Sequence, residues 1–229
     1  QFSGRLHSDT AATIDEYAMN LLNLLSLYHV EPERIEGGIL GSVVPALTGR
    51  VLAALRMLSS ARILTVGPGL KSGIKLRLDN PAQLGAELLC GAVAALAEGP
   101  GPLAVISADT AISIMAVNEK QELVGGVIMP GPQLSQAGLV EKTAQLPQID
   151  LSAPAAPSIL GKNTAACLQN GFVLGTAGLL DGLAERFRAE LGPDLKFYAT
   201  GNLPRPIREA CRTNILYRET LITDGLYRI

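Results

Sequence analysis

The sequence has little of what marks a nucleic-acid-binding, membrane-spanning or secreted protein. Charged residues make up only 17% of its 229 residues, and no cluster of lysine and arginine stands out to bind a polyanion. No apolar run reaches the roughly 18 residues that a membrane span needs, and no signal peptide is visible. We therefore expect a cytoplasmic protein that binds neither nucleic acid nor a membrane.

Cysteine and histidine are scarce as well. The three cysteines, Cys90, Cys167 and Cys211, lie far apart in the sequence, and none belongs to a Cys-x-x-Cys pair. We expect them to be small buried residues in a reducing compartment, without disulfides. His7 and His29 are isolated, which favours surface or core positions over metal ligation.

Apolar residues, in contrast, are abundant. They make up 48% of the chain, the mean hydropathy is +0.27, and the net charge is only -2. A surplus of apolar surface needs a partner to cover it, so we expect a stable oligomer.

The first half of the sequence alternates helix and strand patterns. Thr13 and Glu16 have the spacing of a capping box, and the apolar residues over 17–28 recur at helical spacing. Further elements are predicted as follows: strands over 35–42 and 62–66, a helix over 45–58 that Pro45 opens, and a helix over 81–98. This α-β-α-β-α order indicates a parallel sheet covered by helices.

The second half has a different order. Three closely spaced strands are predicted over 103–107, 111–117 and 123–129, with a turn over 118–121. The remaining elements follow: a helix over 134–145, a surface loop over 146–160, a helix over 163–191 that glycines 171–178 could break, strands over 196–200 and 215–217, and a helix over 221–227. Two β-β-β-α-β-α units, the first without its opening strands, would make an α/β fold of the two-domain acetate/sugar kinase–actin-like (ribonuclease H-like) class.

Several short stretches, in order and spacing, resemble the type III pantothenate kinase family. Each of them alone is a weak signal, since short Gly/Pro motifs recur by chance, but together they run colinearly over almost the whole chain. They are Asp15-Glu16-Tyr17, Gly41-Ser42-Val43-Val44-Pro45, Val66-Gly67-Pro68-Gly69, Asp79-Asn80-Pro81 with Gly85-Ala86, Gly125-Gly126 with Pro130-Gly131, Gly161-Lys162-Asn163-Thr164, and Ala199-Thr200-Gly201.

The resemblance implies a reaction and an assembly. The family transfers the ATP γ-phosphoryl group to the 4'-hydroxyl of pantothenate, the first step of coenzyme A synthesis. It uses Mg²⁺ and a monovalent cation, potassium or ammonium, and its members are dimers with the pantothenate site near the interface. We expect residues 1–98 to form an incomplete N-terminal half, and residues 99–229 to form a C-terminal half that carries the dimer interface.

The family also has a phosphate cradle, an N-terminal Asp-x-Gly-Asn-Thr turn in which glycine lets backbone N–H groups approach phosphate. This sequence contains no such turn. Either the turn precedes Gln1 or the protein lacks it, and the resemblance favours the first.

The family base is the aspartate of Gly-Ala-Asp-Arg, where this chain has Gly85, Ala86, Glu87 and Leu88. Glu87 keeps the carboxylate but adds a methylene, and a shift of about 1 Å costs roughly 100-fold in rate. Leu88 removes the positive partner. The resemblance implies that these four residues contact substrate and that Glu87 is the base. Alternatively, Glu87 is an ordinary carboxylate near a helix start. Leu78 replaces a tyrosine that is frequent in the family.

The third family motif is Asp-Phe-Gly-Thr-Ala-Thr-Thr, aligned with residues 107–113. Ser107 stands where the family has the aspartate that serves the monovalent cation, and a neutral hydroxyl is a poor ligand for a hard cation. Asp109 could supply a metal-binding carboxylate from its place in the turn, or simply bond its own backbone. Thr110 matches a threonine near ATP, whereas Ile112 replaces another threonine.

Two other positions keep family residues. Thr164 matches a threonine that contacts pantothenate from the neighbouring protomer, although it could equally be a helix N-terminal residue beside Asn163. Thr200 and Gly201 match a segment near the nucleotide, and Asn202 replaces a second glycine.

Three hypotheses follow for function. In the first, this chain is a catalytically degenerate subunit of a heteromeric pantothenate kinase, paired with a paralogous chain. In the second, it is a self-sufficient kinase that uses Glu87 as base and Asp109 for the cation. In the third, it is a non-enzymatic regulator on the same scaffold.

Overall fold

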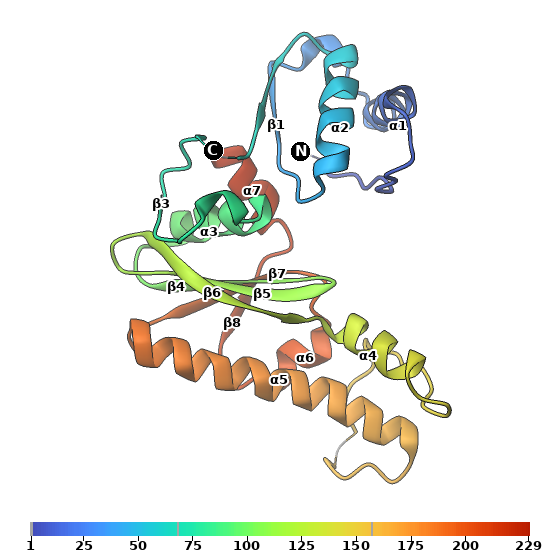
Figure 1. Cartoon of the computed structure of the whole chain (residues 1–229), viewed down its shortest axis with the longest axis vertical. Helices are drawn as coiled ribbons and strands as arrows, with labels where there is room; N and C mark the ends of the chain where they lie inside the picture. The colour runs from blue at the N-terminus through green and yellow to red at the C-terminus, as the bar shows by residue number, and fades with distance from the viewer. Residues whose placement is uncertain (1, 68, 157) are drawn as a thin grey trace. The chain divides into compact units, whose positions relative to one another are not determined.

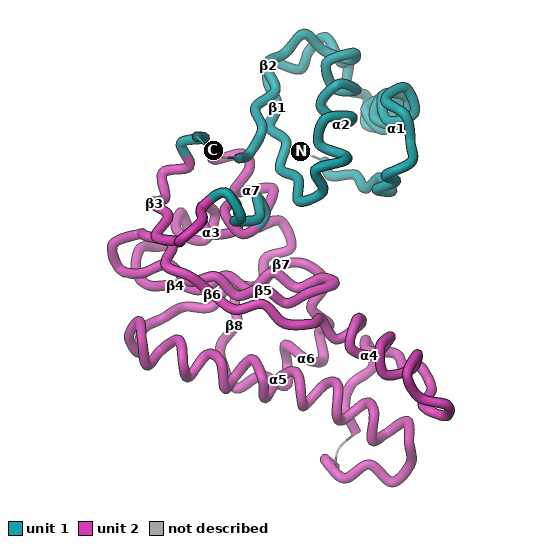
Figure 2. The backbone as a smooth tube through the Cα atoms, viewed as in Figure 1, with its two compact units in different colours: residues 1–71, 82–87 teal, residues 72–81, 88–229 magenta. Residues whose placement is uncertain are grey.

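A computed structural model describes residues 2–67, 69–156 and 158–229 of the chain (Figure 1). The chain forms two compact units (Figure 2): unit 1 is Gln1–Lys71 with Ala82–Glu87, and unit 2 is Ser72–Pro81 with Leu88–Ile229. The predicted boundary at residue 98 separates the two halves of an actin-like fold, which is a different division from these compact units. It stays a prediction.

Unit 1 is built from two helices and a parallel strand pair. Helix α1 (Ile14–Leu27) begins with the predicted capping box, since Thr13 and Glu16 exchange hydrogen bonds between side chain and backbone. Strands β1 (Gly37–Leu40) and β2 (Arg62–Thr65) are parallel, as predicted. The other elements are a 3-10 turn, η1 (Pro32–Arg34), and helix α2 (Pro45–Leu58).

The small core of unit 1 lies where the two helices meet. It contains Tyr17 and Ala18 of α1 with Leu47 and Ala54 of α2. Ala54 is completely buried, which allows the helix backbones to approach closely. Pro45 starts α2 at its first helical position, where the missing N–H costs nothing.

Unit 2 is organised around a six-stranded sheet with the order β3-β6-β5-β4-β7-β8. The central strands β6, β5 and β4 pair antiparallel, whereas β4, β7 and β8 pair parallel. The strands are β3 (Lys75–Leu76), β4 (Leu103–Ala108), β5 (Ala111–Val117), β6 (Glu122–Pro130), β7 (Lys196–Gly201) and β8 (Ile215–Tyr217). Three strands joined by hairpins and then two parallel strands confirm the predicted element order of the second half.

Helices cover both faces of this sheet (Figure 1). Helices α5 and α6 lie on one face, and α3 and α7 lie on the other. Their bounds are α3 (Ala86–Glu98), α4 (Pro132–Glu141), α5 (Thr164–Leu191), α6 (Arg205–Ala210) and α7 (Leu221–Arg228). Among the helices of the described chain, none combines the length and apolarity that crossing a bilayer requires.

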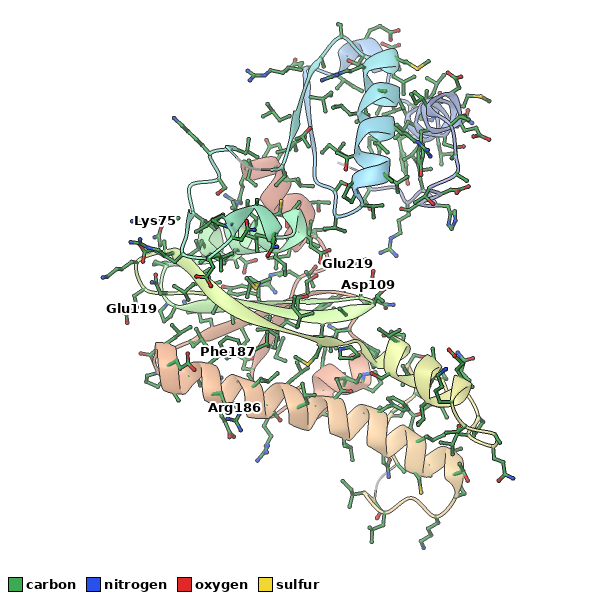
Figure 3. The ribbon with its side chains drawn as sticks, in the orientation of Figure 1. Lys75, Asp109, Glu119, Arg186, Phe187 and Glu219 are labelled. Atoms are coloured by element: carbon green, nitrogen blue, oxygen red, sulfur yellow. The ribbon has the colours of Figure 1, made fainter. Side chains whose placement is uncertain are left out.

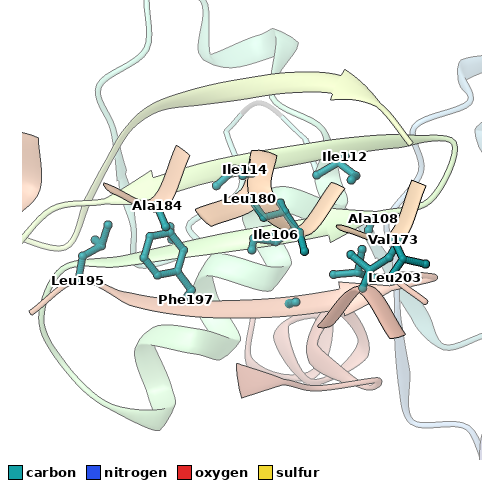
Figure 4. Close-up of a cluster of buried hydrophobic side chains, with 14 residues drawn as sticks. Ile106, Ala108, Ile112, Ile114, Val173, Leu180, Ala184, Leu195, Phe197 and Leu203 are labelled. Carbon is teal, nitrogen blue, oxygen red and sulfur yellow. The ribbon is translucent and has the colours of Figure 1, made fainter. Parts of the chain in front are cut away.

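The main core fills the space between the sheet and α5 (Figure 4). Alternate residues of β4, such as Ile106 and Ala108, point toward α5, which contributes Val173 and Leu180. Phe197 of β7 is the largest fully buried side chain of the described residues. The two-residue alternation places the intervening residues of each strand on the opposite face, toward α3 and α7.

Three predictions about helices differ from the structure. The helix predicted over 81–98 begins only at Ala86, because Pro81–Gln83 forms a separate 3-10 turn, η2. The helix predicted over 134–145 begins at Pro132, whose fixed φ suits the first helical position, and ends at Glu141. Glycines 171–178 do not break α5, because its apolar face packs on the sheet and offsets the roughly 1 kcal/mol that each glycine costs.

Three short elements were not predicted from the sequence: the 3-10 turn η1, the strand β3 and the helix α6. The prediction that all three cysteines are buried was wrong for Cys167, which is exposed on α5. Cys90 is fully buried and Cys211 is partly buried.

The loop over 146–160 is held in place by three side-chain amides. Gln136 of α4 exchanges two hydrogen bonds with the backbone of Ile149, at 3.0 and 3.3 Å. Gln169 of α5 donates to the carbonyl of Ala153 at 2.5 Å. Asn170, which is 4% exposed, accepts from one loop N–H and donates to two loop carbonyls. The described residues of this loop therefore have fixed partners although they form neither helix nor strand.

Candidate active site

The candidate site is built around the turn that joins β4 to β5. Asp109 and Thr110 lie exposed in this turn, at the same end of the sheet as Glu219 (Figure 3). The N–H of Asp109 donates to the carbonyl of Ala111 at 2.9 Å, and the carbonyl of Thr110 accepts from Gly131 at 2.8 Å. The backbone of the turn is thus fixed, while its two side chains face solvent.

Two glycines flank the turn at close range. A β-carbon at Gly131 would overlap the carbonyl of Asp109, and one at Gly201 would overlap the carbonyl of Ala108. Gly201 also has a φ of +83°, which side-chain-bearing residues rarely adopt. These close approaches explain why the chain has glycine directly after both β6 and Thr200.

A row of hydroxyl side chains crosses the sheet beside the turn. Ser107 on β4 is paired in register with Ser113 on β5 and with Thr200 on β7. All three are buried, between 1% and 8% exposed, and their neighbours in sequence belong to the core on the α5 side. The hydroxyls therefore lie on the face that carries α3 and α7, and the row contains no carboxylate.

The segment that leaves β7 is tied to β8 and to the residues after it. The hydroxyl of Tyr217 donates to the carbonyl of Gly201 at 2.7 Å. The N–H of Arg218 donates to Ala199 at 2.8 Å, and Thr200 Oγ1 donates to the carbonyl of Glu219 at 3.4 Å. A backbone that is fixed before a ligand arrives is a suitable surface for phosphate or sugar oxygens.

The N-terminus of α4 adjoins the same turn. Gly131 is the N-cap residue of α4, and its N–H bonds the turn at Thr110. Gln133, in the first turn of α4, donates to the carbonyl of Asn202 at 3.5 Å, while its Oε1 has no partner among the described residues. The positive end of the helix dipole therefore faces the candidate site, which favours an anionic ligand.

The carboxylate of Asp109 is available for a ligand. Within the described residues it makes no hydrogen bond or ion pair, so the alternative of an aspartate that bonds its own backbone is not what the structure has. The described residues contain no group of three or more His, Cys, Asp or Glu side chains that could hold a metal ion by themselves. A cation at this turn would need further ligands from a bound substrate or from water.

The residues aligned with the family base lie at the start of α3. Glu87 is in the first turn of this helix and is partly buried, as the alternative of a helix-start carboxylate predicts. Ala86 and Leu88 are buried, at 8% and 6% exposure, and Gly85 precedes the helix. Burial of Leu88 gives it a packing role that an arginine could not fill without a partner.

Comparisons with known proteins identify the family of this chain. A model of the type III pantothenate kinase family matches residues 1–186. A type III pantothenate kinase from Exiguobacterium sp. is 35% identical over 97% of this chain and 86% of its own length. One from Syntrophotalea carbinolica is 36% identical over 98% of this chain and 88% of its own length. The chain belongs to the type III pantothenate kinase family.

A structural comparison shows the fold of this family member. A Campylobacter jejuni protein described as a Baf family transcriptional activator superposes with a TM-score of 0.52 at 16% identity, covering 91% of this chain and 85% of that one. Together with the strand order of unit 2, this confirms the predicted actin-like α/β class.

Thr164 has the position that its helical alternative predicts. It is the first residue of α5, it is exposed, and the adjacent Asn163 caps the helix by accepting from Ala166 at 2.9 Å. No hydrogen bond joins Thr164 to the β4–β5 turn within residues 2–67, 69–156 and 158–229. Its contact with pantothenate across a family dimer stays a prediction.

Three residues near the site, Ser113, Gln133 and Tyr217, were not predicted from the sequence. Ser113 had a signal, because it is a polar residue at an alternate position of an otherwise apolar strand. Gln133 and Tyr217 had none, since their contacts with Asn202 and Gly201 depend on the packing of α4 and on the pairing of β7 with β8.

Proposed function

We propose that this chain is a subunit of a pantothenate kinase in the cytoplasm, which transfers the γ-phosphoryl group of ATP to the 4'-hydroxyl of pantothenate in coenzyme A biosynthesis. One observation carries the proposal beyond family membership. The β4–β5 turn and the end of β7 lie side by side with their backbones fixed by close glycine contacts, and they place the exposed Thr110 and the buried Thr200 at the same end of the sheet.

In this proposal the nucleotide binds at that end of the sheet. Thr110, Thr200 and Gly201 contact the nucleotide, and the N-terminus of α4 adds a positive potential. Phosphoryl transfer depends mainly on positioning and on charge neutralisation, so fixed backbone groups suit it. Asn202, in place of a second glycine, still donates its N–H to the carbonyl of Ala108.

Asp109 is our candidate ligand for Mg²⁺. Mg²⁺ in kinases is held by one or two carboxylates together with substrate phosphates and water, so a single exposed carboxylate fits it. The metal would neutralise charge on the transferred phosphoryl group. Ser107 offers only a neutral hydroxyl to potassium or ammonium, so binding of a monovalent cation here rests on the family resemblance alone.

Glu87 is the candidate base, with Gly85, Ala86 and Leu88 beside the substrate. A base must come within hydrogen-bond reach of the hydroxyl that it activates. Replacing Glu87 with Gln keeps the shape and removes the basic oxygen. If the lone chain is active, this change should abolish turnover while ATP still binds, and unchanged turnover would exclude Glu87 as base.

We propose further that this chain works in a heteromer with a paralogous, catalytically complete chain. Thr164 would serve the partner's pantothenate site, and the exposed Ile159 and Leu160 nearby in sequence support a covered surface. The altered positions Glu87, Leu88 and Ser107 support a degenerate role. A homodimer is the alternative.

Purification with and without its genomic neighbours tests the heteromer. Steady-state turnover should appear only for the mixed complex, and Thr164→Ala in this chain should raise KM for pantothenate there. Full activity from the lone chain would overturn the heteromer and favour the self-sufficient kinase. Tight calorimetric binding of ATP and pantothenate without turnover in any complex would favour a regulator.

A further inference from the structure

Tyr217 fixes the carbonyl group of Gly201. Gly201 ends the segment Ala199-Thr200-Gly201, which we call the candidate nucleotide segment. The tyrosine hydroxyl donates to the carbonyl of Gly201 at 2.7 Å. Gly201 in turn lies against the carbonyl of Ala108, and the next N–H, from Asn202, donates to the same Ala108 carbonyl. The Gly201–Asn202 peptide is therefore held at both ends, by the Tyr217 hydroxyl at its carbonyl and by the carbonyl of Ala108 at its N–H.

Arg208 holds the ring of this tyrosine. Its guanidinium carbon lies 3.8 Å from the centroid of the Tyr217 ring, a close cation–π contact. The Nε of Arg208 is buried and has no hydrogen-bond partner among the described residues, which leaves the guanidinium stacked on Tyr217. Arg208 belongs to α6, which packs on α5, so the stack links the nucleotide segment to the rigid helical layer.

The neighbouring residues extend this attachment. Arg218 donates its N–H to Ala199, and Glu219 accepts from Thr200. Three consecutive residues after the start of β8 thus hold three consecutive residues at the end of β7. Groups that are fixed before the ligand arrives lose less entropy on binding, which increases affinity.

We propose that Tyr217, with Arg208 stacked on its ring, is a positioning residue for the nucleotide. It would not touch the nucleotide, and would act by fixing the exposed Gly201 peptide, and with it the Thr200–Gly201 segment that the proposed function assigns to ATP. This inference rests on the proposed function, because it requires that those two residues bind the nucleotide.

The test is a calorimetric titration of the whole chain with ATP and Mg²⁺. Tyr217→Phe keeps the ring and its stack but removes the hydrogen bond, and should weaken ATP binding about fivefold. Arg208→Gln should weaken it similarly, whereas Arg208→Lys, which keeps a cation over the ring, should restore most of the affinity. Pantothenate binding should be unchanged in all three variants.

Tyr28→Phe is the matched control. Tyr28 makes the same kind of bond in unit 1, from its hydroxyl to the carbonyl of Ser3 at 2.9 Å, so its loss should leave ATP affinity unchanged. Hydrogen exchange measures whether the Gly201–Asn202 peptide has become less fixed. The amide of Asn202 should exchange faster in Tyr217→Phe than in the wild type.

The outcomes separate two kinds of failure. If the wild type binds ATP and Tyr217→Phe binds it equally well, the positioning role is wrong even if Asn202 exchanges faster. An equal loss of ATP and pantothenate binding would also overturn it, because that is the result of general destabilisation. If the wild type binds no ATP, the proposed nucleotide site fails and this inference fails with it. Should Tyr217→Phe not fold, the Arg208 pair of variants decides by the same criteria.

Discussion

The Cα of Gly201, at the end of β7, lies directly beside the carbonyl oxygen of Ala108, at the end of β4, with no room between them for a side chain. The contact joins the two segments that carry Thr200 and Thr110. Both the geometry of the candidate site and its sensitivity to substitution follow from this contact.

Gly201→Ala should therefore destabilise the fold and weaken ATP binding together. The added methyl overlaps Ala108, and the φ of +83° is strained for alanine, so the free energy of unfolding should fall by about 1–3 kcal/mol. Urea unfolding measures it. Gly182→Ala is the control, because this glycine is inside α5 with open space around it, and alanine there should stabilise by roughly 0.5–1 kcal/mol. Equal effects of the two changes would contradict the packing at Gly201.

Thiol labelling should distinguish the three cysteines. Burial raises the pKa of Cys90 and of Cys211 to about 11, so both stay protonated and poorly reactive at pH 8. Cys167 is exposed on α5. A disulfide reagent should react quickly with one thiol per folded chain and with three after denaturation, and Cys167→Ser should remove the fast phase. Fast labelling of two or more thiols in the native wild type would contradict this burial.

Acid should weaken the attachment of β3 to β6. Hydrogen bonds from Arg77 and then Asn118, together with Lys75, lower the pKa of Glu122 to about 2 from an ordinary value near 4.5. The pKa is lower in the folded state, so the stabilisation is fully present above about pH 4.5 and is lost as the pH falls toward 2. With Glu122→Gln, the free energy of unfolding should fall less as the pH is lowered through this range.

The exposed Glu119, in the turn just before Glu122, provides the control for that experiment. Its side chain makes no hydrogen bond or ion pair in the described part of the chain. Glu119→Gln should therefore leave the acid dependence of the free energy of unfolding as in the wild type. If both variants give the same curve between pH 5 and pH 2, the cluster around Glu122 does not contribute to acid stability.

Asp181→Ala should destabilise unit 2 without a direct effect on the candidate site. Asp181, 5% exposed on α5, accepts hydrogen bonds from the backbone N–H groups of Arg212 and Thr213 at 2.9 and 2.8 Å. Burial raises the pKa of its carboxyl, but these hydrogen bonds lower it by more, so the pKa is below its ordinary value. Leaving both N–H groups without a charged acceptor should cost about 2–3 kcal/mol in chemical unfolding. A cost near that of exposed Asp194→Ala would contradict this.

Local signals predicted much of the fold. The capping box at Thr13, the proline at Pro45 and the apolar run of 111–117 each act within a few residues, and the structure has the elements that they indicate. The two residues of β3 could not be found this way. They form a strand only because Glu122 and Leu123 pair with them from far along the chain.

The candidate site was less predictable, for a similar reason. Family resemblance indicated Asp109, Thr110 and Thr200 as separate positions, but only the register of β4 against β7 brings their segments together. Tyr217 was not recognisable, because a tyrosine in a short strand has no sequence signal for the carbonyl that it will bind. Its partner is chosen by tertiary packing.

The pairing of β4 with β7 also has a consequence for synthesis of the protein. The two strands are neighbours in the sheet, yet two other strands and the whole of α5 lie between them in the chain. A nascent chain therefore exposes an unpaired edge of β4 until α5 and β7 have left the ribosome. The candidate nucleotide segment is among the last parts to assemble, and pairs of such high sequence separation form slowly.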